Sequence, residues 1–178
     1  MMVLLSRIIA KLICSTLKSR QNRIYALYYK RYDISPSFKF NGENICLSGD
    51  GEIKLGNNSY IGQRSSILSY KGARVEIGDN CSISHNVRIY TYNLDPISVI
   101  KEQKSQQNSK IGDVVIGDNC WIGANVFIKE NVTIGNSCVI SANSLVTRNI
   151  PNNSIAMGVP AKVVKQYDTE QCCFIEVK

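Results

Sequence analysis

A six-residue repeat governs the sequence from Leu55 onward and constrains the fold more than any other feature. An aliphatic anchor returns at every sixth position within each run, at Leu55, Ile61 and Ile67, at Ile77, Ile83 and Ile89, and at Ile116, Ile122, Ile128, Ile134, Ile140 and Val146. An α-helix has a period of about 3.6 residues and a simple strand a period of two, so neither produces this spacing. The repeat predicts short strands that stack coil upon coil with their anchors inward.

The positions between the anchors are also patterned, and they indicate where each strand turns. Four residues after the anchor the side chain is small, at Ser59, Ser65, Cys81, Val87, Cys120, Val126, Val132, Cys138 and Ser144. Three residues after it, asparagine occurs in eight of the twelve hexads, at Asn58, Asn80, Asn86, Asn119, Asn125, Asn131, Asn143 and Asn149. Asparagine tolerates the left-handed backbone conformation better than other non-glycine residues. A turn every six residues is therefore predicted.

The net charge of the chain is concentrated at its N-terminus. The sequence has 21 Lys+Arg against 14 Asp+Glu, a formal charge of +7. Residues 1–32 contain no acidic residue but seven basic ones, Arg7, Lys11, Lys18, Arg20, Arg23, Lys30 and Arg31. Residues 33–178 are consequently neutral overall, and we expect no nucleic-acid partner.

Residues 1–33 form a separate N-terminal segment that reads as an amphipathic helix. Its apolar residues recur at intervals of three and four, at Leu5, Ile8, Ile9, Leu12, Ile13 and Leu17. Arg7 and Lys11 interrupt a run too short to span a bilayer, and no signal-peptide cleavage pattern follows. Two interpretations stay open, packing against the core or a partner subunit, and peripheral contact of residues 1–32 with an anionic membrane. The expected location is cytoplasmic, with attachment to the inner face of the membrane under the second interpretation.

The numbers and positions of histidine and cysteine limit which metal sites, catalytic groups and disulfides the chain can form. The single histidine, His85, excludes metal centres that need several imidazoles from one chain. The three-histidine site of a γ-carbonic anhydrase is excluded as well, unless carboxylates substitute for the histidines. No metal is therefore expected. The seven cysteines include no CxxC pair, and Cys81, Cys120 and Cys138 occupy the small position of the hexad. A reduced compartment is the preferred interpretation.

Three strings, IGDNCWIGANVFI, VTIGNSCVISANSLVTRNIP and IAMGVPAKVV, resemble the hexapeptide-repeat acyltransferases with a left-handed parallel β-helix. The resemblance covers about residues 47–166 and favours the branch that acetylates sugars of surface polysaccharides such as O-antigen. It implies three hexads per coil, acetyl-CoA as donor, and a homotrimer with active sites between subunits. The expected architecture is an all-β solenoid over 34–166, an extruded loop at about 93–110, a short helix after Pro160, and a tail at 167–178.

Stacking the turns gives a candidate catalytic column. With three hexads per coil, positions eighteen residues apart lie above one another, and re-entry in phase at Ile116 would place His85 over Ala124 and Ala142. Neutral imidazole could then take the proton of an attacking hydroxyl, a contribution of about 10²–10⁴ in rate. The resemblance implies that the coenzyme contacts Ala124, Ser141, Ala142, Thr147, Arg148, Lys162 and Lys165.

Acceptor contacts are expected around the extruded loop, at Asn86, Tyr92, Asn93, Asp95 and Trp121. Alternatives stay open for several of them: Asn93 and Asp95 could simply form the turn before Pro96, and Trp121 could pack at a subunit interface. Asn93 also stands where maltose- and xenobiotic-acetyltransferase relatives have a histidine. Either His85 supplies the base, or the chain has lost it.

The sequence thus predicts an acetyl-CoA-dependent O-acetyltransferase that acts directly on a sugar hydroxyl of a glycan or small molecule. An N-acetyltransferase of an amino-sugar, or an enzyme acting on another small molecule, would use the same residues. A non-catalytic β-helix with a structural or binding role is the alternative from another class.

Overall fold

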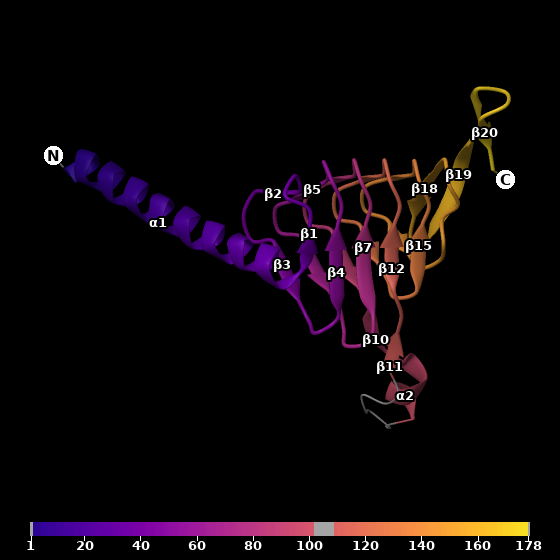
Figure 1. The fold of residues 1–178 in the computed structure, drawn as a ribbon, viewed down its shortest axis with the longest axis horizontal. Coiled ribbons are helices and arrows are strands. Elements are labelled where there is room, and N and C mark those ends of the chain that lie inside the picture. Colours follow the sequence, from indigo (N-terminus) through magenta and orange to yellow (C-terminus); the bar gives the residue numbers. More distant parts are fainter. Residues whose placement is uncertain (1, 102–108, 178) are drawn as a thin grey trace.

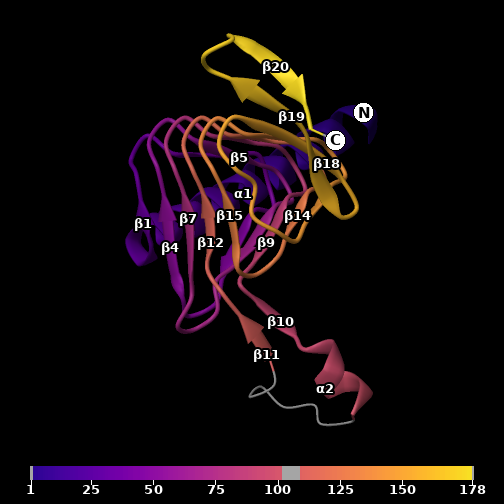
Figure 2. The same ribbon diagram turned by 90° about the vertical axis from the view of Figure 1, so that its right-hand side faces the viewer.

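The computed structural model describes residues 2–101 and 109–177, and its body is a parallel β-solenoid whose three sheets form the faces of a prism (Figures 1 and 2). The first sheet contains β1 (Asp33–Ile34), β4 (Glu52–Leu55), β7 (Arg74–Ile77), β12 (Val114–Ile116) and β15 (Val132–Ile134). The second contains β2 (Lys39–Asn41), β5 (Tyr60–Gly62), β8 (Ser82–Ile83), β13 (Trp121–Ile122), β16 (Val139–Ile140), β18 (Ser154–Gly158), β19 (Ala161–Asp168) and β20 (Cys173–Glu176). The third contains β3 (Cys46–Ser48), β6 (Ser66–Leu68), β9 (Arg88–Tyr90), β14 (Phe127–Ile128) and β17 (Leu145–Val146). The predicted left-handed parallel β-helix is confirmed.

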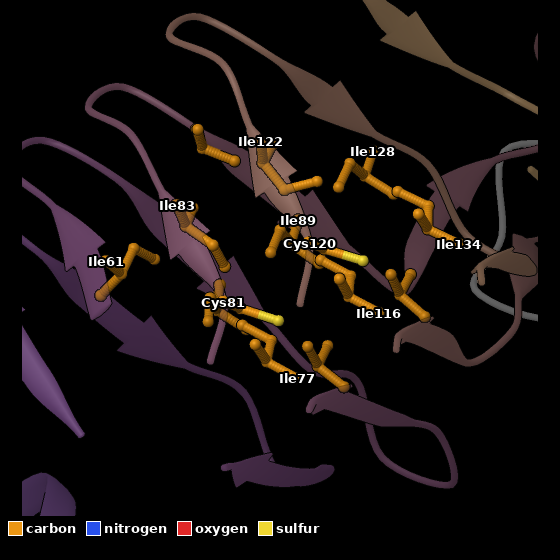
Figure 3. Close-up of a cluster of buried hydrophobic side chains, with 14 of the residues drawn as sticks. Ile61, Ile77, Cys81, Ile83, Ile89, Ile116, Cys120, Ile122, Ile128 and Ile134 are labelled. Atoms are coloured by element: carbon orange, nitrogen blue, oxygen red, sulfur yellow. The ribbon is translucent and has the colours of Figure 1, made fainter. Parts of the chain in front are cut away.

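The core is a set of ladders of hexad anchors (Figure 3). Ile61, Ile83, Ile122 and Ile140 follow one another through paired strands and are all 0% exposed. Burial of a side chain of this size stabilises the fold by about 1.5–3 kcal/mol. The small positions are buried as well, so the residues four after each anchor fill the space beneath the corners, as the repeat predicts.

The buried cysteines Cys81, Cys120 and Cys138 belong to this packing. Each thiol sulfur lies 3.0 Å from a main-chain carbonyl oxygen of the next coil. Hydrogen bonding to the Cys138 and Cys81 thiols, together with burial, raises the pKa of the Cys120 thiol well above its usual range. Cys120 therefore stays protonated. All three side chains fill space between coils, which confirms their interpretation as packing residues.

The corners confirm the predicted left-handed turns at seven of the eight asparagines. Positive φ angles occur at Asn58, Asn80, Asn86, Asn119, Asn125, Asn131 and Asn143. Arg64 and Ser137 take the same conformation in hexads that lack asparagine. Asn149 does not, and its side-chain carbonyl instead accepts a hydrogen bond from the main-chain N–H of Thr133 at 2.8 Å.

The C-terminal end of the solenoid corrects one prediction. Residues 161–167, AKVVKQY, were expected to form a short helix but lie in strand β19, which pairs antiparallel with β18 and with β20. The free edge of β18 offers unpaired main-chain groups, and the β-branched Val163 and Val164 favour an extended backbone. The antiparallel strands β19 and β20 therefore cover this edge, where a helix had been expected (Figure 2).

The predicted N-terminal helix is α1 (Met2–Arg31), and only its C-terminal part lies against the solenoid (Figure 1). Tyr25 is buried, stacks on Phe40 with ring centroids 4.6 Å apart, and donates a hydrogen bond to the carbonyl of Gly42. In the projecting part, Leu12 and Ile13 are 63% and 54% exposed. The side chains of residues 1–5 and 8 lie outside the described ones. Among the described residues, none of the helices combines the length and hydropathy that crossing a bilayer requires.

The longest insertion into the coils lies between β9 and β12 and overlaps the loop predicted at about 93–110. It consists of β10 (Tyr92–Leu94), α2 (Pro96–Ile100) and β11 (Ser109–Ile111), and β10 pairs antiparallel with β11. Residues 102–108 of the predicted loop lie outside the described residues. The hairpin projects from the corner between the third and first sheets (Figure 2).

Candidate active site

The corner between the second and third sheets carries His85, Ala124 and Ala142 with their following asparagines, and we call it the alanine corner. The main-chain N–H of Asn125 donates to the carbonyl of His85 at 3.1 Å, and that of Asn143 donates to the carbonyl of Ala124 at 2.8 Å. The chain therefore re-enters the repeat in phase after the insertion. His85, Ala124 and Ala142 stand one above the other, at the spacing predicted from the repeat.

An asparagine ladder holds this corner together. The side-chain N–H₂ of Asn86 donates to the carbonyl oxygen of Asn125 at 2.8 Å, and Asn125 donates in turn to Asn143 at 2.9 Å. The amide nitrogen of Asn86, which was predicted to form a turn and to contact the acceptor, is thus engaged within the protein. The ladder fixes the spacing of the main-chain groups beside Ala124 and Ala142.

His85 is exposed at one end of this column. Its Nδ1 lies 3.3 Å from the hydroxyl oxygen of Ser84. A serine hydroxyl can donate or accept. When Nδ1 carries the hydrogen and donates it to Ser84, Nε2 is left with the lone pair that a general base needs. The neighbouring serine therefore permits the tautomer in which Nε2 faces solvent as a base.

Small side chains leave the alanine corner open to a ligand. Ala142 is exposed and Ala124 half-buried, and Gly123 precedes Ala124 at a close approach of two coils. A Cβ atom at Gly123 would lie 2.5 Å from the main-chain nitrogen of Ala142, so no larger residue fits there. Ser141 lies next to Ala142 and uses its main-chain N–H to bond to the carbonyl of Ala156 at 3.0 Å.

Trp121 lies on the outer face of the second sheet. It is in register with Ser82 and Val139 and is 58% exposed, whereas its neighbour Ile122 points into the core. Trp121 is three residues before Ala124 on the same coil, so it lies on the part of this outer face next to the alanine corner. Either contact with a ligand or contact with another subunit would cover this indole.

The second group of candidate residues lies at the corner from which the hairpin leaves, which we call the hairpin corner. It comprises β10, α2 and β11 together with the turn of the next coil at Lys129 and Glu130. The side-chain N–H₂ of Asn93 donates to Oε2 of Glu130. Glu130 is buried, and its Oε1 lies 3.2 Å from the ammonium of Lys129. Asn93 therefore does more than form a turn, because it bonds across coils.

Glu130 is a residue that the sequence analysis missed. It occupies a corner two residues after the anchor Ile128, where a charged side chain is ordinarily solvated. Its place next to the insertion could have been predicted from the spacing of the repeat, because Glu130 lies eighteen residues after Gly112, where the insertion rejoins the coils. Positions with that spacing stack, so the root of the hairpin had to lie beside Glu130.

Tyr92 and Asp95 complete the hairpin corner. Tyr92 stacks on Tyr70 with ring centroids 4.7 Å apart, and its hydroxyl accepts from Ser109 at 3.1 Å. Asp95 precedes α2, and its carboxylate oxygen Oδ1 is buried without a hydrogen-bond donor in the described chain. The ammonium of Lys110 lies 3.6 Å from that oxygen. Among the described residues, this long ionic contact is thus the one pairing of the buried Oδ1 of Asp95.

The other residues expected to contact the coenzyme lie towards the C-terminal end of the solenoid. Thr147 and Arg148 follow β17, one coil beyond Lys129 and Glu130 at the corner between the third and first sheets. Lys162 and Lys165 belong to β19, and Lys165 pairs with Glu176 at 3.0 Å. One chain therefore distributes the predicted site residues over the alanine corner, the hairpin corner and the last coil, and does not gather them into one pocket. In the described part of the chain, no group of three or more His, Cys, Asp or Glu side chains could hold a metal ion.

Comparison with known proteins places this architecture in a family. The model for the bacterial transferase hexapeptide, of six repeats, matches residues 113–148, and the hexapeptide repeat of succinyl-transferase matches residues 52–91. Polysialic acid O-acetyltransferase of Escherichia coli O1:K1 / APEC is 33% identical over 133 residues, 75% of this chain and 42% of that enzyme. WbbJ of Escherichia coli K12, whose name refers to O-acetyl transfer in lipopolysaccharide biosynthesis, is 31% identical over 153 residues, 80% of this chain and 77% of WbbJ.

Solved structures agree with this assignment. The hexapeptide-repeat acetyltransferase VCA0836 of Vibrio cholerae, complexed with acetyl coenzyme A, superposes with a TM-score of 0.70 at 26% identity, covering 81% of this chain and 76% of that one.

Coils of three short strands with stacked aliphatic anchors and asparagine turns define a parallel β-solenoid of hexapeptide repeats. The chain belongs to the bacterial hexapeptide-repeat transferases. These relatives and structural neighbours are acetyltransferases. The chain spans about half the length of two curated relatives, 56% of YJL218W of Saccharomyces cerevisiae and 42% of the polysialic acid enzyme.

Proposed function

We propose that this protein is an acetyl-CoA-dependent O-acetyltransferase that acts on a sugar hydroxyl of a surface polysaccharide or its precursor. The column of His85, Ala124 and Ala142 carries the proposal, because it combines a solvent-facing imidazole with a corner whose small side chains expose main-chain groups. The VCA0836 complex with acetyl coenzyme A supports acetyl-CoA as the donor. The polysialic acid enzyme and WbbJ support a glycan acceptor.

The chemistry is a direct transfer in a complex of enzyme, donor and acceptor. The acceptor hydroxyl oxygen forms a bond to the thioester carbonyl carbon while His85 Nε2 takes the hydroxyl proton. The carbon–sulfur bond then breaks, and the proton on the imidazolium goes to the departing thiolate. The products are the acetyl ester and free CoA, with no acyl-enzyme.

We further propose that a second copy of the chain completes the site, in a homotrimer. The candidate residues of one chain lie on different corners, so a neighbour is needed to bring an alanine corner and a hairpin corner together. Between Lys39 of β2 and Lys165 of β19, the outward positions along this register of the second sheet are uncharged, at Tyr60, Ser82, Trp121, Val139 and Ile155. The first sheet instead carries the ion pairs Lys54–Glu76 and Arg74–Asp113. Light scattering should give three chains per particle, and a monomer that turns over sugar would contradict this.

The projecting part of α1 supports a further proposal, contact with an anionic membrane. Residues 6–20 combine exposed Ile9, Leu12 and Ile13 with basic side chains and no acid. Like charges would also oppose bundling of several such helices. Vesicles containing phosphatidylserine should retain the full chain, and Leu12→Gln/Ile13→Gln should reduce retention several-fold. The exposed hairpin variant Ile111→Gln is the control. Equal retention of all three proteins would contradict membrane contact.

Thiol release from acetyl-CoA in the presence of a sugar panel tests the enzymatic proposal. Maltose, a galactoside and an oligosialic acid are suitable acceptors, and amino-sugars test the N-acetyl alternative. His85→Ala should lower kcat by about 10²–10⁴ without weakening CoA binding measured by calorimetry. Glu76→Gln, on the outer face of the first sheet, is the matched control. An unchanged kcat in His85→Ala would exclude His85 as the base.

Asn93 gives the non-catalytic alternative its support, because relatives of the maltose-acetyltransferase type have a histidine at the corresponding place. The same assay separates the two functions. Binding of CoA without turnover of any acceptor would favour a binding module, whereas failure to bind CoA would exclude an acetyltransferase.

A further inference from the structure

We propose that Glu130 is a positioning residue for the acceptor, which acts by fixing the side-chain amide of Asn93. The inference rests on the proposed function and deepens it, because it defines which hydrogen-bonding groups the acceptor must present. Three observations at the hairpin corner carry it: the burial of Glu130, its bond to Asn93, and the buried carboxylate oxygen of Asp95 without a hydrogen-bond donor in the described chain.

Glu130 is buried, so its carboxylate requires an ionic partner and a hydrogen-bond donor. The side chain is 7% exposed, and a buried charge is costly unless it is paired and hydrogen-bonded. Lys129 supplies the ionic partner on Oε1, and Asn93 supplies the donor on Oε2. The contact with Asn93 also joins the insertion to the coil of Glu130.

The chemistry of this contact determines how Asn93 faces outward. An ionised carboxylate only accepts hydrogen bonds, whereas an amide has one donating and one accepting side. Glu130 therefore selects the rotamer in which the N–H₂ group of Asn93 points at the coil. The carbonyl oxygen Oδ1 then lies on the other side of the amide, away from Glu130, where it can accept a hydrogen bond from a ligand.

Asp95, two residues further along the hairpin, carries a buried carboxylate oxygen. Among the described residues its Oδ1 has only the ammonium of Lys110 at 3.6 Å, beyond hydrogen-bond distance. The root of the hairpin thus offers an outward acceptor, Oδ1 of Asn93, beside a buried carboxylate oxygen that lacks a hydrogen-bond donor among those residues, and it needs ligand donors. A polyol, with several O–H groups on neighbouring carbons, matches this arrangement, and an acceptor without hydroxyl or ammonium groups does not.

The first experiment compares Glu130→Gln with wild type on the sugar that gives turnover. Glutamine keeps the size of the side chain but can present either its oxygen or its nitrogen, so it no longer selects one orientation of Asn93. We expect the KM for the sugar to rise about three- to tenfold, with kcat and the KM for acetyl-CoA within about twofold. Glu76→Gln, the same substitution on the outer face of the first sheet where Glu76 pairs with Lys54, is the control and should keep the KM for the sugar within about twofold. An unchanged sugar KM in Glu130→Gln overturns the assignment.

The second experiment reverses the polarity of the pair. Asn93→Asp places two carboxylates against each other and should raise the KM for the sugar about tenfold or more. Adding Glu130→Gln supplies a side-chain amide that can donate to the new carboxylate, which still presents an acceptor oxygen outward. We therefore expect Asn93→Asp/Glu130→Gln to recover a KM within about threefold of wild type. A double variant as impaired as the product of the single effects would overturn the inference.

A third measurement does not need turnover, and it separates this inference from the proposed function. The side-chain amide signal of Asn93 in a ¹⁵N-asparagine-labelled protein should be observed as one hydrogen-bonded species in wild type and should move in Glu130→Gln. An unmoved signal overturns the role of Glu130 even in an active enzyme. A moved signal in a protein that transfers acetyl to no sugar sustains the positioning of Asn93 and overturns only the proposed function.

Discussion

The alanine corner and the hairpin corner show two ways in which one solenoid builds a site. At the alanine corner, main-chain bonds and the asparagine ladder join corresponding positions of successive coils. At the hairpin corner, the contacts join an insertion to the coils through unlike side chains, such as Asn93 with Glu130 and Tyr92 with Tyr70. Repetition makes the first corner rigid and uniform, whereas the second can change its side chains without disturbing the stack.

The largest expected effect contrasts two isoleucines near these corners. Ile122 is 0% exposed beneath the alanine corner, and Ile100 is 80% exposed at the end of α2. Ile122→Ala should lower the free energy of unfolding by about 2–5 kcal/mol, because it removes buried methyl groups and leaves a cavity. Ile100→Ala should change it by less than about 0.5 kcal/mol.

Urea denaturation at one fixed protein concentration measures both isoleucine variants, since assembly would make stability concentration-dependent. A comparable loss for Ile100→Ala would break the comparison. It would mean that α2 is buried in solution against another copy of the chain.

The fold was predictable from the sequence wherever the repeat holds. The spacing of six identified the anchors, the buried small positions and seven of the eight asparagine turns, because each of these depends on residues within one hexad. The strand β19 was not predictable in the same way. Its segment, AKVVKQY, suits a helix or a strand, and pairing with the edge of β18 decides between them.

The candidate site was likewise predictable where it follows the repeat and not predictable where it depends on the insertion. The stacking of His85 on Ala124 followed from intervals of the repeat alone, because the insertion leaves the phase intact. The partnership of Asn93 and Glu130 did not, because the path of an insertion has no period to extrapolate. Only its end, at Gly112, is fixed by the stack. The roles of these residues in binding and catalysis stay predictions.

A smaller effect distinguishes the two corners at their turns. Asn125 and Asn131 both have φ = 60°, the first in the ladder of the alanine corner and the second next to Glu130. Replacement by alanine should cost each about 1–2 kcal/mol, because a Cβ-bearing residue without a polar side chain is disfavoured in this conformation. Asn125→Ala should lose about 1 kcal/mol more, since it also removes the bonds to Asn86 and Asn143.

Glycine at the same two positions is the control for this difference. Glycine tolerates positive φ without a steric penalty, so Asn131→Gly should be milder than Asn131→Ala. The excess loss at position 125 should persist in Asn125→Gly, because it comes from the ladder. Equal losses at the two positions, measured as unfolding midpoints, would contradict a structural role for the ladder.

The smallest expected effect concerns the ion pair of the hairpin corner. Lys110 and Asp95 are 3.6 Å apart, with side chains 58% and 26% exposed, so solvent screens their attraction. Lys110→Met should therefore lower the free energy of unfolding by less than about 1 kcal/mol. The loss should shrink further at high salt, where the pair in wild type is already weakened. A salt-independent loss as large as that of Ile122→Ala would show that the hairpin corner depends on this pair as the alanine corner depends on its core, and the distinction between the two corners would fail.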